Sequence, residues 1–383
     1  MAVIIADRTA VRRVEAERYL RYILICFAAT VITVRWFLSM TGYPRLGGGE
    51  LHIAHVLWGG LLLFAAALAP LVIANRWAAD AGAILAGTGV GLFIDEVGKY
   101  ITQTNDYFFA PAAPIIYSIF LLLVLLYVRV RRETVQSVRH DLYGAIDGIG
   151  QVIDHDLDAR RYRELRSRLI HARDHADDRK RARLAAALLE FVDAERAAFR
   201  ERPPGRLERW SERLRMFEAR WLTLGRVRWL FVAALMAMGV AAFVDFLVLP
   251  WAALYPLDWE RAGQLIAQGA EAPGGTRLFL LLARFALGGV VGTLLVLGAT
   301  LLMLGRIHGG LTCGYFGLLL SLTTLNLLVF YFDQFGAVGT ALLDFAALIG
   351  LVRYRRRLRA AAGPLRRREL RGEWHELERQ PVA

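Results

Sequence analysis

The residues most able to do chemistry in this sequence are ionisable side chains at the ends of long apolar stretches. His52 and His55 stand near the start of one such stretch, and Asp95, Glu96 and Lys99 stand near the end of the next. A charged side chain at the centre of a bilayer costs ~2.5–3.5 kcal/mol on insertion scales, so it needs a partner, water or a function. These five residues are therefore the first candidates for a site.

Three arrangements of these residues are open. Asp95 and Lys99, four residues apart on a helix, can neutralise each other and form a structural ion-pair layer. Alternatively, the carboxylates and imidazoles can bind a cation or relay protons. In the third arrangement a divalent metal such as Zn²⁺ is held by His52, His55 and an acidic residue, Asp95 or Glu96. Glu96 would then be the general base of an intramembrane or lipid hydrolase.

The sequence around these residues predicts helices that cross a membrane. Hydrophobic residues make up 56% of the chain, yet the charged residues are confined mainly to segments between apolar runs, which a single soluble core does not produce. The fold class is predicted to be all-α, with about eight spans. The apolar stretches run over 20–40, 51–75, 79–102, 111–130, 227–249, 277–305, 309–333 and 336–354.

The charge distribution predicts orientation and partners. The chain carries 47 Lys and Arg against 35 Asp and Glu, and the arginines flank the apolar stretches. This placement is typical of helices oriented with their basic ends in the cytoplasm and facing anionic lipid headgroups, not of nucleic-acid binding. The almost exclusive use of Arg over Lys indicates a bacterial source. We therefore expect a bacterial plasma (inner) membrane protein with both termini in the cytoplasm and with lipid as its partner.

The stretches form two sets of four that resemble each other, which indicates a parallel internal repeat. The matches pair HVLWGG at 55–60 with RFALGG at 284–289, and FIDEVG at 93–98 with YFDQFG at 331–336. We predict a first four-helix membrane unit at 1–132, a cytoplasmic helical insert at 133–225, a second four-helix unit at 226–357 and a basic tail at 358–383.

The repeat extends the candidate site and suggests which copy carries it. In the second copy Arg284 and Gln334 replace His55 and Glu96, so the first copy is expected to hold the site and the second to supply scaffold and countercharge. Asp344 is expected to lie somewhat deeper in the second copy. The candidate proton, ion or solute site comprises His52, His55, Asp95, Glu96, Lys99, Arg284 and Asp333.

The leading hypothesis is a non-enzymatic membrane protein that binds or translocates an ion, a proton or a small polar solute near its outer face. The hydrolase is the alternative, and its catalytic set is not defined by the sequence. No cofactor is expected except, in that alternative, a divalent metal. A second alternative is a membrane anchor or sensor that acts through the insert, which would contact a cytoplasmic partner or a second copy of the chain.

The insert and one membrane stretch also show helical patterns. Leu142, Ile146, Ile149 and Ile153 recur at helical spacing, which predicts an amphipathic helix in the insert. Small residues recur every fourth position before Asp95, in the order Ala83, Gly87 and Gly91. Such a stripe allows two membrane helices to pack closely, so Asp95 is expected to face a neighbouring helix and not lipid.

Two segments of the first half also carry a resemblance. ELHIAHVLWGG at 50–60 and GLFIDEVGK at 91–99, followed by NDYFF at 105–109, resemble segments of a family of bacterial multi-pass membrane proteins to which no activity is assigned. The resemblance implies a natural membrane fold and a bacterial source. It implies no mechanism.

Overall fold

The computed structural model describes most of the chain as two compact units, each of which is considered by itself. The units comprise Met1–Gly205 and Arg206–Ala383. Within the described residues every regular element is a helix. The structure describes residues 10–42, 55–104, 106–107, 109–131, 137–154, 157–195, 209, 224–254 and 276–377.

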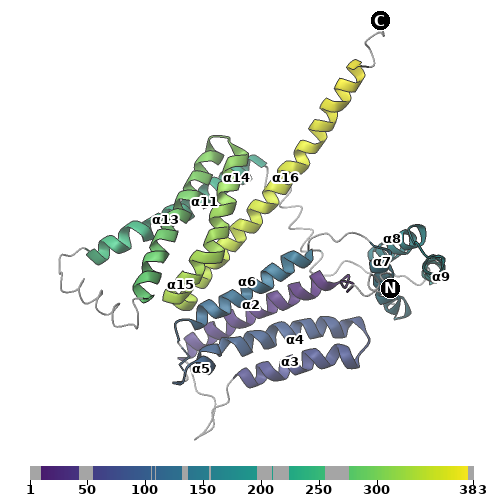
Figure 1. The fold of residues 1–383 in the computed structure, drawn as a ribbon, viewed down its shortest axis with the longest axis horizontal. Helices are drawn as coiled ribbons and strands as arrows, with labels where there is room; N and C mark the ends of the chain where they lie inside the picture. Colours follow the sequence, from purple (N-terminus) through teal and green to yellow (C-terminus); the bar gives the residue numbers. More distant parts are fainter. Residues whose placement is uncertain are drawn as a thin grey trace, which may run out of the picture. The chain divides into compact units, whose positions relative to one another are not determined.

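The first unit is built around helix α4, which packs against α2 on one side and α3 on the other (Figure 1). Helix α2 also packs against α6. The bounds of these helices are α2 (Ala16–Thr41), α3 (His55–Val72), α4 (Arg76–Asp95) and α6 (Ala112–Arg131), with the short α5 (Val97–Ile101) after α4.

Glycines let these helices approach one another closely. A Cβ atom added at Gly87 would lie 2.5 Å from the carbonyl oxygen of Ile23 in α2, and one at Gly91 would lie 2.9 Å from Cβ of Thr30. The predicted small-residue stripe therefore faces α2. On the other side of α4, a Cβ at Gly59 would lie 2.9 Å from the carbonyl oxygen of Gly89. Small residues allow such close approach of backbones inside a membrane.

Charged side chains occupy both ends of this helical group. At the end where α2 and α4 begin, Arg18 lies 2.6 Å from Asp80, and Arg76 forms an ion pair with Glu15. Asp95 lies at the opposite end of α4. It is ~22 Å from Asp80 along the helix, at ~1.5 Å per residue. The helix between these polar layers is apolar, as expected for a segment within the hydrocarbon region.

The insert contains a three-helix bundle made of α7 (Val138–Ile153), α8 (Ala159–Asp174) and α9 (Arg179–Ala194). Ala145, Val152, Leu165, Leu169 and Val192 are among its fully or nearly fully buried side chains. The sequence predicts the helix α7 but only part of its buried face. Ile146 is 55% exposed and Ile153 is 64% exposed, because the preceding residues, Ala145 and Val152, face the core instead.

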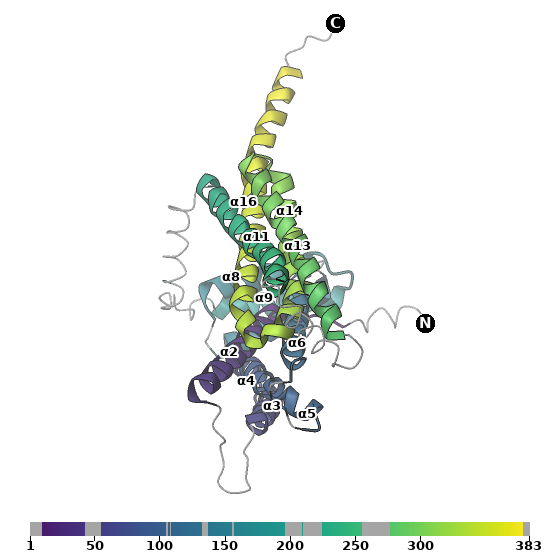
Figure 2. The ribbon, with the colours of Figure 1, turned by 90° about the vertical axis from the view of Figure 1, so that its left-hand side faces the viewer.

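In the second unit helix α13 lies between α11 and α14, and α14 also packs against α16 (Figure 2). Leu235, Leu295, Leu302, Leu318 and Leu351 form the fully buried centre of this group. The helices are α11 (Leu224–Leu254), α13 (Thr276–Met303), α14 (Ile307–Leu320), α15 (Asn326–Asp333) and α16 (Val338–Leu377).

Two irregular turns shape the last helices of this unit. A π-helical turn over Ser321–Leu325 joins α14 to α15, and a 3₁₀ turn over Gln334–Ala337 joins α15 to α16. Gln334 has a φ of 47°, in the left-handed region, and it ends α15. The chain reverses there, as two contacts between α16 and the preceding helices show. Asp344 lies beside Ser321, and Leu351, further along α16, lies beside the earlier Gly314.

Seven helical stretches in the described residues are long and apolar enough to cross a membrane. This finding confirms the predicted class, which is all-α with several helices able to cross a membrane. The last stretch, Ile307–Arg359, includes the chain reversal at Gln334–Ala337. The stretches are Ala16–Thr41, His55–Val72, Arg76–Asp95, Ala112–Arg131, Gly225–Val244, Phe279–Met303 and Ile307–Arg359.

The contact between α3 and α4 leads to a first prediction. Gly59→Ala places a methyl group 2.8 Å from the backbone nitrogen of Phe93, so α3 has to move away from α4. We expect the free energy of unfolding in detergent to fall by ~1–3 kcal/mol, the range for overpacked sites. Gly60→Ala is the matched control, because a Cβ atom at Gly60 meets nothing within 4 Å. Equal losses in the two variants would contradict the close α3–α4 contact.

Candidate functional site

The first unit contains a charged cluster at the end of α4, made of Arg35, His55, Asp95, Glu96, Lys99 and Tyr107. Asp95 is its centre and is 0% exposed. Arg35 Nε donates to Oδ1 of Asp95 at 2.5 Å, and Arg35 Nη2 donates to the Asp95 carbonyl oxygen at 2.8 Å. The Tyr107 hydroxyl donates to Oδ2 at 2.7 Å, and His55 Nε2 lies 3.2 Å from the same atom. Both carboxylate oxygens of Asp95 therefore have partners.

Glu96 is the second buried acid of this cluster and is also 0% exposed. The backbone N–H of Val56 donates to its Oε2 at 3.1 Å, and Lys99 Nζ donates to its Oε1 at 2.7 Å. His55 Nδ1 lies 3.4 Å from Oε1. Glu96 lies between the end of α4 at Asp95 and the start of α5 at Val97, and the two consecutive carboxylates enter the same cluster.

The charges of this cluster balance. Arg35 and Lys99 offset Asp95 and Glu96, and both cations also lie over the ring of Tyr107, at 4.0 Å and 5.2 Å from its centroid. Buried ions are tolerated when geometry and hydrogen bonds compensate for lost hydration. The arrangement can therefore hold α2, α3, α4 and α5 in one register.

The structure brings four predicted site residues together, namely His55, Asp95, Glu96 and Lys99. Of the three arrangements, the ion-pair layer pairs Asp95 with Lys99. The structure instead shows Arg35 beside Asp95 and Lys99 beside Glu96. The sequence hypothesis did not place Arg35 and Tyr107 in the site. Arg35 could have been found from the sequence, because it is a lone arginine in an apolar stretch. Tyr107 could not have been found in this way, because it lies in the short connection between α5 and α6 and follows no helical pattern.

Three of the four residues of the proposed metal set, His55, Asp95 and Glu96, lie close together. His52 lies outside the described residues. Among those that are described, no group of three His, Cys, Asp or Glu side chains is arranged to hold a metal ion. The hydrolase alternative thus depends on a residue that the structure does not describe.

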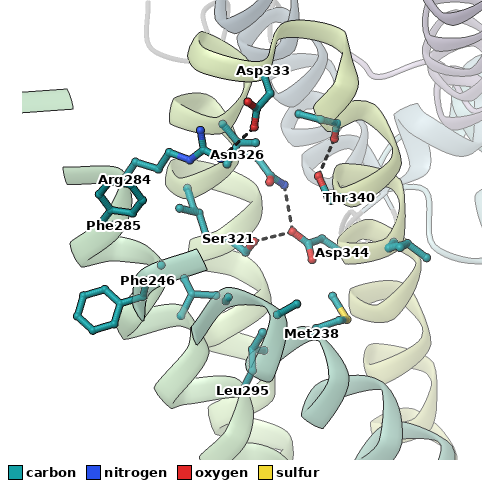
Figure 3. Close-up of a pocket in the computed structure, with 18 of the residues that line it drawn as sticks. Met238, Phe246, Arg284, Phe285, Leu295, Ser321, Asn326, Asp333, Thr340 and Asp344 are labelled. Carbon is teal, nitrogen blue, oxygen red and sulfur yellow. Dashed lines mark hydrogen bonds and ion pairs between the residues drawn. The ribbon is translucent and has the colours of Figure 1, made fainter. Parts of the chain in front are cut away.

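Arg284 and Asp333, the other two predicted residues, form a pair within the second unit. Arg284 Nη2 lies 2.9 Å from Oδ2 of Asp333, whose side chain is 50% exposed. This pair borders a cavity of about 620 Å³ between α11, α13, the π-helical turn, α15 and α16 (Figure 3). The apolar side chains of this cavity include Met238, Phe246 and Phe285.

Asp344 is the buried acid of this cavity and is 7% exposed. Ser321 Oγ donates to Oδ2 of Asp344 at 2.5 Å, and Asn326 Nδ2 donates to the same oxygen at 3.1 Å (Figure 3). Neither hydrogen bond involves Oδ1. Within the described residues, no Lys, Arg or His side chain forms an ion pair with Asp344.

The π-helical turn explains how two residues five positions apart reach one oxygen atom. In a regular α-helix Ser321 and Asn326 would project ~140° apart around the axis. Here the backbone N–H of Asn326 bonds to the carbonyl oxygen of Ser321, which places one residue above the other. π-Helical turns of this kind occur frequently at functional sites. Sequence periodicity assumes a regular helix and therefore misses this pair.

Comparison with known proteins gives no match to a protein-family model, to a curated protein or to a solved structure.

The two Arg–Asp pairs differ in burial, and this difference leads to a second prediction. Removing one partner of a buried ion pair costs ~3–5 kcal/mol, because the other charge stays buried without compensation. Arg35→Met is therefore expected to destabilise the first unit by that amount in detergent unfolding. Arg284→Met, at the half-exposed Asp333, should cost at most ~1 kcal/mol. If Arg35→Met is no more destabilising than Arg284→Met, the charged cluster does not hold the helices together.

Proposed function

We propose that this protein is an integral membrane protein that binds a small solute in the cavity of its second unit. The observation that carries the proposal is a half-open cavity of about 620 Å³ between apolar helices, lined by both apolar and polar side chains. Ligand sites typically have a volume of ~300–1,000 Å³, mostly apolar walls and a few polar groups. The combination of Asp344, Ser321 and Asn326 supplies those polar groups.

This proposal assigns different roles to the two units. In the first unit, the charges of Asp95 and Glu96 are offset by neighbouring cations, which suits a structural layer. In the second unit, Asp344 has neutral partners and borders a cavity. The sequence hypothesis gave the binding role to the first copy. We favour the second, because a cavity and a carboxylate without a cation coincide there.

We also propose that the chain crosses a bacterial plasma membrane eight times, as two parallel repeats with cytoplasmic termini. The reversal at Gln334–Ala337 supports eight crossings, since it divides the last apolar stretch into two arms. The repeat is supported by helix ends at matching positions. Helix α4 ends at Asp95 and α15 ends at Asp333, and a short helical turn follows each of them. The basic residues beside the spans support the orientation.

Cysteine labelling tests whether the cavity admits a small solute. Thr340 lines the cavity, so Thr340→Cys should react with methyl methanethiosulfonate in the membrane-embedded protein. Cys26 and Cys313 are first replaced by Ala. Ala299→Cys is the matched control, because Ala299 is 0% exposed in α13 and does not line this cavity.

We expect Thr340→Cys to be labelled much faster than Ala299→Cys, with mass spectrometry as the readout. If Thr340→Cys is labelled as slowly as the buried Ala299→Cys, the cavity is closed to small solutes and the proposed function is wrong.

A further inference from the structure

We propose that the cavity of the second unit binds an organic cation, with the cationic group paired to Asp344 and an apolar portion against the surrounding helices. This inference rests on the proposed function and specifies its ligand class. Three observations support it: the charge balance of the cavity, the geometry of the carboxylate and the nature of the walls.

The charge balance leaves one acid of the cavity without a countercharge. Arg284 is the basic residue among the lining side chains, and it lies 2.9 Å from Asp333. Asp344 has only the neutral donors Ser321 and Asn326 as hydrogen-bond partners in the described part of the chain. A carboxylate among apolar helices needs a cation or a proton to offset lost hydration. A cationic ligand would provide that charge.

The geometry orients the carboxylate for such a ligand. Ser321 and Asn326 both hold Oδ2, one at 2.5 Å and the other at 3.1 Å. Oδ1 takes part in neither bond, and the carboxylate stands beside the cavity in Figure 3. A group that is fixed before binding loses little conformational freedom when the ligand arrives. The two donors therefore position Asp344 while leaving one oxygen for the cation.

The walls favour an organic cation over a metal ion. A metal such as Ca²⁺ takes ~6–8 oxygen ligands, whereas the cavity walls are mainly apolar and include Met238, Phe246 and Phe285. A volume of about 620 Å³ accommodates a molecule with an apolar body.

Three probes with the same benzyl group and different charges test the inference on the purified full-length protein in detergent. They are benzyltrimethylammonium, benzyl alcohol and phenylacetate. We expect saturable binding of benzyltrimethylammonium and a matching rise in Tm, with little effect of the other two. Asp344→Asn should weaken binding of the cation by at least ~10-fold, because the buried charge partner is lost.

A second pair of variants tests the same point without removing Asp344. Thr340 precedes Asp344 by one helical turn on α16 and lines the same cavity. Thr340→Lys would place a tethered ammonium beside Asp344 and should abolish binding of benzyltrimethylammonium. Thr340→Met adds a neutral side chain of similar length. This variant should still bind benzyltrimethylammonium in preference to the other two probes. This comparison stays informative even if Asp344→Asn fails to fold.

Each other outcome identifies what is wrong. Equal binding of the three probes would overturn the charge preference while leaving a solute cavity. Displacement of benzyltrimethylammonium by Na⁺, but not by choline at equal ionic strength, would assign Asp344 to an inorganic ion and overturn the inference. If no probe binds although Thr340→Cys is labelled, the ligand class is wrong and the proposed function stands. If Thr340→Cys is not labelled, the proposed function itself fails.

Discussion

The structure depends on one constraint, which is that a hydrocarbon environment does not hydrate charge. Every buried ion among these helices must therefore find its compensation within the protein or in a ligand. Asp95 meets this requirement through Arg35, His55 and Tyr107, and Glu96 meets it through Lys99. Because these partners come from different segments, charge compensation also fixes how the helices of the first unit pack.

The same constraint gives the second unit a different role. Its rim charges, Arg284 and Asp333, compensate each other, whereas Asp344 lies deeper and has only neutral partners in the described residues. A carboxylate without a cation beside a cavity is costly unless it binds a cation or a proton. The π-helical turn that aligns Ser321 with Asn326 is a further departure from regular helix geometry at this place. Together these features make the cavity the best-supported binding site.

The sequence predicts the helices well because apolar length and glycine spacing are local properties. It also places Asp95, Glu96 and Lys99 at one helix end and predicts that Asp95 faces a neighbour. It does not predict which cation meets which acid, since that depends on packing between α2, α3 and α4. The Ser321–Asn326 alignment is not predictable from regular periodicity because it requires a π-helical turn. The cavity likewise results from how separate helices pack.

The most direct test of this account is to locate a bound cation by anomalous scattering. Crystals of the full-length protein grown with 4-bromobenzyltrimethylammonium would show the position of the bromine atom. The account predicts a bromine signal inside the cavity of the second unit, with the ammonium group beside Asp344, and no such signal in Asp344→Asn. A signal at the charged cluster around Asp95, or one in the cavity that is unchanged by Asp344→Asn, would contradict it.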